Sequence, residues 1–170
     1  MRHQGSYLAA LTLAVVASVA GIACGRETPS VPLPRAEKPL ELLARPTLAG
    51  PSLDLAKLRG KVVVVNFWSP HCRYCAKETP GLQAVADRLQ DRGLELVTVM
   101  MEGTRPDAER FVSDTGLKAP AVIGTPEIAA GYGMLVYPWT VVLDREGKAV
   151  WAIRGMRDEE TFRKMFERYL

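Results

Sequence analysis

The chain has 170 residues, a formal net charge of +3, and 22 Lys and Arg against 19 Asp and Glu. This length is typical of a single domain with one sizeable core. The charge is small and evenly spread, and no run of five like charges occurs, so the composition does not indicate a nucleic-acid-binding protein.

The N-terminus has the pattern of an export signal. Residues 1–6 are polar and include Arg2, and residues 7–23 contain neither charge nor proline. This pattern predicts a signal peptide over residues 1–23. Cys24 directly follows Ala23, and Gly21-Ile22-Ala23-Cys24 resembles a bacterial lipobox, in which the cysteine is lipidated and becomes the new N-terminus.

Two alternatives to lipidation remain open for this segment. The first is ordinary cleavage after Ala23, and the second is an uncleaved anchor, although residues 7–23 are short for crossing a bilayer. All three interpretations place the rest of the chain in the periplasm or cell envelope, where disulfides can form.

A linker and then a domain follow. Residues 25–39 contain four prolines and few side chains that could pack. Together with Cys24 they predict a membrane-anchored linker over residues 24–39, semi-extended because proline favours polyproline II. The folded domain is predicted over residues 40–170.

The predicted elements come from apolar periodicity and from turn residues. Residues 61–68, KVVVVNFW, are typical of a strand buried on both faces. Gly93 is expected to close the helix that begins near Cys72. The predicted order is a β-hairpin turning at Gly50-Pro51 and then a short turn of helix within residues 39–58, a strand at 61–68, a helix at 72–92, a strand at 94–101, a helix at 106–115, a short strand at 120–123, a short helix at 126–130, a hairpin of strands at 139–144 and 149–153, and a helix at 158–169.

This order of strands and helices is that of the thioredoxin fold. The sequence therefore predicts the α/β class, as a three-layer α/β/α sandwich with an N-terminal β-hairpin extension.

The motif that carries chemistry is Cys72-Arg73-Tyr74-Cys75, placed between a buried strand and a helix. The N–H groups and dipole at a helix N-terminus stabilise an anion, so we expect Cys72 to be the reactive thiolate, with a lowered pKa. Cys75, one turn into the helix, would be the more buried partner. In thiol–disulfide exchange, Cys72 would attack a substrate disulfide and Cys75 would resolve the mixed disulfide.

Two other uses of such a cysteine pair are a structural disulfide and a metal site. A purely structural disulfide closing so short a loop would constrain little of the unfolded chain. A zinc site needs about four ligands, whereas the chain has only His3 and His71 and no second cysteine pair. We expect neither a metal nor another cofactor.

Residues 66–80, NFWSPHCRYCAKETP, resemble the TlpA/ResA-like branch of the thioredoxin superfamily, which is related to the redoxin and AhpC/TSA proteins. The matching positions are Asn66, Phe67, Trp68, Cys72, Cys75, Glu78 and Pro80. The resemblance implies a thiol–disulfide oxidoreductase that reduces disulfides of exported proteins, for example in cytochrome c maturation, with electrons from a membrane thiol donor.

Other functions stay open beside this one. An oxidant or isomerase would use the same residues, because direction depends on potential and partners. A copper-binding assembly factor on this fold is disfavoured, since no histidine follows His71. A thiol peroxidase is disfavoured because its sequence context is absent around Cys72.

The resemblance also assigns roles to individual residues. Pro138 matches the fold's cis-proline facing the cysteines, so Tyr137 would present its backbone to a substrate peptide. Glu78 would be a partly buried acid that handles the proton of the second thiol, because the position where thioredoxins carry an Asp is Asn66. A solvated Glu78 paired with a base is the alternative.

Aromatic residues are expected around the thiols. Trp68, Tyr74, Tyr137 and Trp139 would form an apolar rim that contacts peptide substrates, with Trp68 counted as substrate-binding. Core packing of Trp139 is an equal alternative. His71 is expected to be an exposed loop residue, with a positive charge beside Cys72 as the other interpretation.

Overall fold

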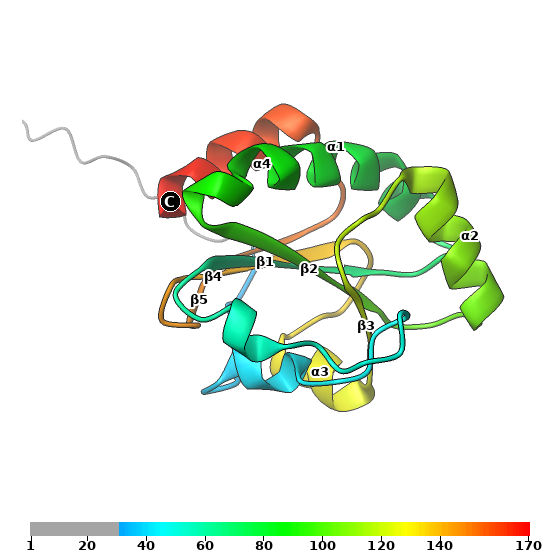
Figure 1. The fold of residues 1–170 in the computed structure, drawn as a ribbon, viewed down its shortest axis with the longest axis horizontal. Helices are drawn as coiled ribbons and strands as arrows, with labels where there is room; N and C mark the ends of the chain where they lie inside the picture. Colours follow the sequence, from blue (N-terminus) through cyan, green and yellow to red (C-terminus); the bar gives the residue numbers. More distant parts are fainter. Residues whose placement is uncertain (1–30) are drawn as a thin grey trace, which may run out of the picture.

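The computed structural model describes residues 31–170 as a sheet between two layers of helices (Figure 1). The order of elements confirms the predicted α/β/α sandwich of the thioredoxin type from the first strand onward. The strands and α-helices are β1 (Val62–Trp68), α1 (Arg73–Leu89), β2 (Leu94–Met100), α2 (Arg105–Thr115), β3 (Ala121–Ile123), α3 (Pro126–Gly131), β4 (Trp139–Leu143), β5 (Ala149–Arg154) and α4 (Glu159–Phe166). The 3₁₀ turns are η1 (Pro39–Leu43), η2 (Leu55–Lys57), η3 (Gln90–Arg92) and η4 (Glu167–Tyr169).

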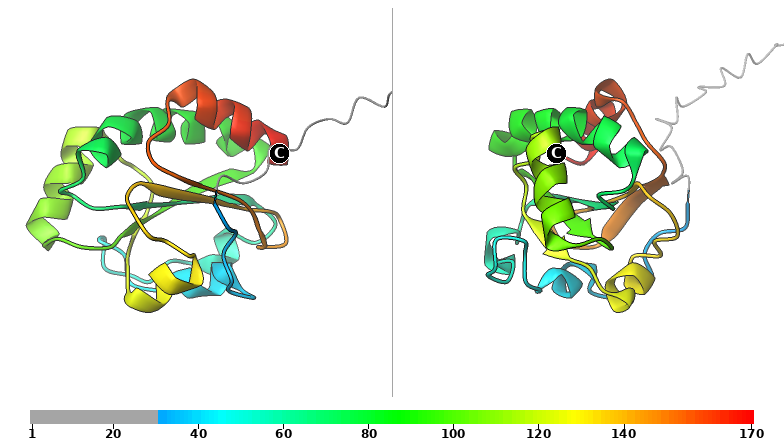
Figure 2. Two further views of the ribbon diagram at one scale, coloured as in Figure 1. Left: turned by 180° about the vertical axis from the view of Figure 1, so that it is seen from behind. Right: turned by 90° about the vertical axis from the view of Figure 1, so that its right-hand side faces the viewer.

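The sheet has the strand order β3-β2-β1-β4-β5. Strands β1, β2 and β3 run parallel, β4 is antiparallel to β1, and β5 is antiparallel to β4. Strand β1 lies in the centre of the sheet, and helices cover both faces of the sheet (Figure 2). Every residue of β1 is therefore buried, which explains why four consecutive valines occur in it.

Successive side chains of β1 point to opposite faces of the sheet and so belong to two different hydrophobic cores. Val63, Val65 and Phe67 pack in a cluster with Ile128 of α3 on one face. Val62 and Val64 pack with side chains of α1 and α4 on the other. Asn66 shares the parity of Val62 and Val64, so this polar side chain faces the layer of α1.

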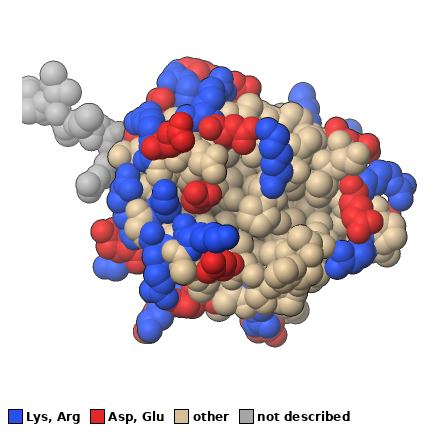
Figure 3. Space-filling model, viewed as in Figure 1, with Lys and Arg blue, Asp and Glu red and all other residues tan. Residues whose placement is uncertain are grey.

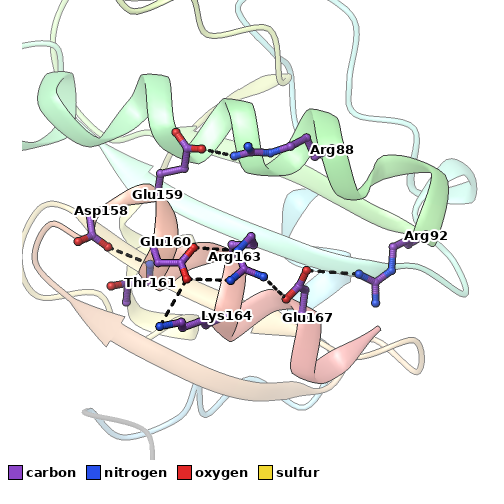
Figure 4. Close-up of polar contacts among 9 residues, drawn as sticks. All are labelled: Arg88, Arg92, Asp158, Glu159, Glu160, Thr161, Arg163, Lys164 and Glu167. Carbon is purple, nitrogen blue, oxygen red and sulfur yellow. Dashed lines mark hydrogen bonds and ion pairs between the residues drawn. The ribbon is translucent and has the colours of Figure 1, made fainter.

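Charged side chains join α1 to α4, and η3 to η4, at the surface (Figure 4). Arg88 pairs with Glu159, and Arg92 pairs with Glu167 at 3.5 Å. Exposed pairs of this kind contribute little individually. The attachment of α4 therefore rests mainly on its buried face, which includes Phe162, Met165 and Phe166. On the face shown in Figure 3, acidic and basic side chains are intermixed over these two helices.

Capping residues explain where the helices begin and end. Thr104 and Asp107 form a capping box at the start of α2, and Asp158 caps α4. Gly93 takes the left-handed conformation expected after the first long helix, with φ 93°. Helix α2 begins at Arg105, one residue before the predicted start at Pro106.

The predicted N-terminal β-hairpin is present only as a short turn and not as two regular strands. The chain turns at Gly50 as predicted, with an antiparallel bridge between Pro46 and Ser52, and the Leu53 N–H donates to the Arg45 carbonyl at 3.0 Å. Pro39–Leu43, predicted as part of the hairpin, is a 3₁₀ turn. Proline nitrogens at 46 and 51 cannot donate to a ladder, which prevents a regular hairpin. Residues 46–48 instead hydrogen-bond to β3: Ile123 N–H donates to the Pro46 carbonyl at 2.9 Å, and Leu48 N–H donates to that of Ala121 at 2.8 Å.

Residues 31–39, predicted as linker, contact the folded domain. Val31 packs against the core cluster on the α3 side, and the Ala36 N–H donates to the Gly131 carbonyl at 3.3 Å. The predicted signal peptide and the lipidated Cys24 lie outside the described residues. Within residues 31–170, no helix has both the length and the apolar character needed to cross a membrane.

Candidate functional site

Cys72 and Cys75 form a disulfide at the N-terminus of α1, with their Cα atoms 5.2 Å apart. The buried strand β1 delivers the chain to this point, and Cys72 is the N-cap residue of the helix. The site lies at the end of the sheet where α1 approaches α2, away from the chain's C-terminus (Figure 1). Both cysteines are therefore where the sequence predicted them.

The two sulfurs differ in exposure and in hydrogen bonding. Cys75 is completely buried, whereas Cys72 is partly exposed. The Cys75 backbone N–H donates to Cys72 Sγ at 3.1 Å. In the reduced protein such a donor at the helix N-terminus favours a thiolate on Cys72. Cys72 can thus meet a partner molecule, and Cys75 can react only with Cys72.

Glu78 is a buried carboxyl group one turn after Cys75 on α1, with 3% of its surface exposed. Residues three apart on a helix share a face, so Glu78 lies on the side of Cys75. Burial raises the pKa of Glu78 from 4.5 to about 7, although hydrogen bonds from Asn66 and Arg157 oppose this effect. The partly buried acid that the resemblance implied is confirmed as buried, and the alternative of a solvated glutamate is wrong.

Hydrogen bonds from two segments orient this carboxyl group, and a third segment orients one of the donors. Asn66 Nδ2 of β1 donates to Glu78 Oε1 at 2.9 Å and also to Thr140 Oγ1 of β4 at 3.0 Å. The Arg157 backbone N–H donates to Glu78 Oε2 at 3.1 Å. Asn66 and Thr140 are register partners in the sheet, which fixes their separation. The sequence did not point to Thr140 or Arg157: strand pairing brings Thr140 to Asn66, and the loop after β5 brings the Arg157 backbone to Glu78.

The loop before β4 lies beside the dithiol. The Tyr137–Pro138 peptide bond is cis, as the resemblance implied, and Pro138 is buried. The Gly155 N–H donates to the Pro138 carbonyl at 2.8 Å, which attaches the loop to the end of β5. Trp139 at the start of β4 pairs with Phe67 near the end of β1, so this loop lies at the end of the sheet from which β1 leads to Cys72. Tyr137 and Cys72 both pack against the apolar cluster that contains Cys75.

The predicted aromatic rim is largely wrong. Trp68 is 1% exposed and stacks on Phe111 with ring centroids 4.2 Å apart, so it lies in the core and not on a substrate-contacting surface. Trp139 is also 1% exposed and belongs to the core. Trp68 is the last residue of β1 and Trp139 is the first residue of β4, and the layers of helices on the two faces of the sheet cover them. Only Tyr74, with 48% exposure, and the half-buried Tyr137 are accessible.

Charged groups near the dithiol are on the surface. The Arg73 guanidinium lies over the Tyr74 ring at 4.7 Å from its centroid. His71 is exposed, as expected. Hydrogen bonds from Thr104 lower the pKa of Asp107, with a smaller contribution from His71. Within residues 31–170 no three His, Cys, Asp or Glu side chains come together as a metal site.

The fold and the helix-capping disulfide together define a thioredoxin-fold protein with a Cys-x-x-Cys site. A family model described as AhpC/TSA family matches residues 30–152, so the chain belongs to that family.

Named relatives fall in the same class. The chain is 32% identical to thiol–disulfide oxidoreductase ResA of Bacillus anthracis over 114 residues, 66% of each protein. It is 30% identical to ResA of Geobacillus thermodenitrificans over 121 residues, which cover 71% of this chain and 70% of that one. The chain thus spans about two thirds of the length of these relatives.

A solved structure shares the fold. It is a secreted Mycobacterium tuberculosis disulfide oxidoreductase described as homologous to Escherichia coli DsbE. The two superpose with a TM-score of 0.69 at 23% identity, over 78% of this chain and 99% of the other. At this identity the likeness supports the thioredoxin-type architecture alone.

Proposed function

We propose that this protein is a thiol–disulfide oxidoreductase that acts on other polypeptides through Cys72 and Cys75. The observation that carries the proposal is the asymmetric dithiol at a helix N-terminus, with one sulfur accessible and the other buried. The names of the ResA relatives support it.

The reaction follows from this asymmetry. In the reductive direction, the Cys72 thiolate attacks a substrate disulfide, forms a mixed disulfide and releases one substrate thiolate, which takes up a proton. The Cys75 thiol then loses its proton, attacks Cys72 Sγ and releases the second substrate thiolate. Two electrons pass from the dithiol to the substrate, and the Cys72–Cys75 disulfide remains.

Glu78 is the proposed general acid–base for Cys75. A buried thiol needs a proton acceptor when it attacks, and Glu78 is the titratable group that lies one turn away on the same helix face. A carboxyl group with a pKa of about 7 exchanges protons readily near neutral pH. Asn66, which has no titratable group, orients Glu78 by a hydrogen bond.

Tyr137 and Pro138 are proposed to hold the substrate chain beside Cys72. They precede β4 at the end of the sheet from which β1 leads to the dithiol, and the backbone of this loop would pair with an extended peptide. The proposal does not include Trp68, whose burial keeps it from direct contact with a substrate.

We further propose that the domain works outside the cytoplasm, attached to a membrane at its N-terminus. The support is the signal-peptide pattern of residues 1–23 and the lipobox-like position of Cys24. The description of the M. tuberculosis protein as secreted agrees with this placement. Exported proteins, including cytochrome c precursors, would be the substrates, and a membrane thiol protein would supply electrons.

The redox potential tests the direction of electron flow. The purified protein is equilibrated in glutathione and dithiothreitol buffers, and its thiols are trapped and counted. A reductant is expected to have a potential near that of thioredoxin, roughly −270 mV. A value near roughly −120 mV would overturn the reductive direction and indicate an oxidant of substrate dithiols.

A further inference from the structure

A groove of about 600 Å³ lies beside the loop that precedes the cis-proline. Its walls are residues 31–33 and Arg35, the end of α3, and residues 133–136, with Trp139 of β4 and Arg154 of β5 also in the lining. Val136 directly precedes Tyr137, and Trp139 directly follows Pro138. The groove therefore shares a wall with the loop before β4, at the end of the sheet from which β1 leads to Cys72.

Exposed apolar side chains concentrate at this groove. Among residues 31–170, the exposed large hydrophobic residues are Leu33, Tyr74, Leu135 and Val136. Three of them line the groove, and Tyr74 lies between the two cysteines. Leu135 is 82% exposed, although a leucine in a loop next to buried strands could have packed inward. Apolar side chains that gather at one exposed place indicate a binding surface.

The charge of the groove favours one sign of partner. Arg35 and Arg154 line it, and no acidic side chain does so among the described residues. Arg154 is exposed at the end of β5, a strand at the edge of the sheet. An occupant with apolar side chains and a nearby carboxylate would match both features.

We propose that this groove binds the segment of a polypeptide substrate next to its disulfide-bonded cysteine, and that it selects apolar residues followed or preceded by an acidic one. The inference rests on the proposed oxidoreductase function. It adds that the groove sets which disulfides reach Cys72, whereas the dithiol alone would react with any accessible disulfide. The exchange itself is the reaction written above, with two peptide thiols as products.

The test uses symmetric peptide disulfides as probes. Each half carries a cysteine with Leu-Val-Asp, Leu-Val-Lys or Ser-Ser-Ser placed either before or after it. Reduced full-length protein is mixed with each probe, the reaction is quenched with iodoacetamide, and the peptide thiol is measured by chromatography. Glutathione disulfide serves as a probe that is too small to fill the groove.

In at least one placement, Leu-Val-Asp is expected to react at least about tenfold faster than Ser-Ser-Ser, as partial burial of two apolar side chains allows. The Leu-Val-Asp peptide is also expected to react about threefold to fivefold faster than the Leu-Val-Lys peptide, a ratio within the free energy of exposed charge pairs. Arg154→Glu is expected to reverse the Asp-to-Lys ratio, and Leu135→Ser to reduce the Leu-Val preference. Lys57→Glu, an exposed position outside the groove, is the matched control and should leave both ratios unchanged.

Equal rates for all peptides in both placements would overturn the groove proposal while the oxidoreductase function stood. A second copy in the groove would also overturn it, and sedimentation would then show a dimer that Leu135→Ser dissociates. If neither the peptides nor glutathione disulfide oxidised Cys72, the proposed function itself would fail, and the inference would fail with it.

Discussion

The Asn66 side-chain amide donates a hydrogen bond of 2.9 Å to the Glu78 carboxylate. This bond joins the central strand β1 to helix α1 one turn after Cys75. Asn66 follows the buried Val62 and Val64 on this face of β1. A polar pair in a core must be hydrogen-bonded, and Thr140 and Arg157 complete the bonding. This arrangement keeps an acid with a pKa of about 7 near Cys75.

Glu78→Gln is expected to change how stability depends on pH. The pKa of Glu78 is about 7 in the folded protein and 4.5 without the effects of folding, so the folded state retains a proton that the unfolded state loses between these values. Stability from this group is therefore fully present below about pH 4.5 and is lost as pH rises through about 7. The loss is about 3 kcal/mol at 1.36 kcal/mol per pKa unit.

Urea unfolding of the oxidised protein from pH 4.5 to 8 measures this effect. The Gln variant should lack the decline, so its stability relative to the natural chain increases with pH. Glu109→Gln, at an exposed position on α2, is the matched control and should follow the natural chain. Parallel pH profiles for the natural chain and the Glu78 variant would contradict the raised pKa.

Asn66→Ala is expected to raise the pKa of Glu78 above about 7. The amide hydrogen bond stabilises the charged carboxylate and so lowers the pKa of Glu78, whereas burial raises it. Without the hydrogen bond, the net rise of this pKa is larger. Carbon-13 NMR of labelled glutamate carboxyl groups across a pH titration reads the change directly. Thr140→Val removes the other acceptor of Asn66 but retains its donation to Glu78, so a smaller shift is expected. A lowered pKa in Asn66→Ala would refute this account.

Substitution of each cysteine should separate the two chemical roles. Cys75→Ser is expected to accumulate mixed disulfides through Cys72, because the buried resolving thiol is gone. Cys72→Ser is expected to abolish turnover, since Cys75 has no exposed surface. Non-reducing electrophoresis after mixing with a disulfide-bearing protein shows the trapped species. Full activity in Cys72→Ser would mean that Cys72 is not the nucleophile.

Gly103→Ala should disturb the loop before the dithiol. Gly103 has φ +101°, and a Cβ there would meet Pro70 Cγ at 2.5 Å, next to His71 and Cys72. Strain at such a φ costs about 1–3 kcal/mol, and the contact must also displace Pro70. Gly116→Ala is the matched control, because its φ is +68° and no atom lies within 4 Å of the added Cβ.

Thermal unfolding and the rate of glutathione disulfide reaction distinguish the two glycine variants. Both should lose stability, but only Gly103→Ala should also slow the reaction of Cys72. An equal reaction rate in both variants would show that the contact with Pro70 does not hold the loop.

The amino-acid sequence by itself determined most of the sheet and the place of the dithiol. Local patterns encode these features: the valine run of β1, the helical spacing after Cys75, and Gly93 in a left-handed conformation that glycine adopts without strain. The Cys-x-x-Cys spacing puts both sulfurs on one helical turn. Each of these depends on residues close together in the chain.

Only the tertiary structure decided what surrounds the dithiol. Burial of Trp68 against Phe111, the contact of Glu78 with Asn66 and Arg157, and the pairing of residues 46–48 with β3 all join segments far apart in sequence. Amphipathic patterns do not reveal whether a tryptophan at a strand end is covered or exposed. That depends on which helix lies above it, and hence on long-range packing of the whole chain.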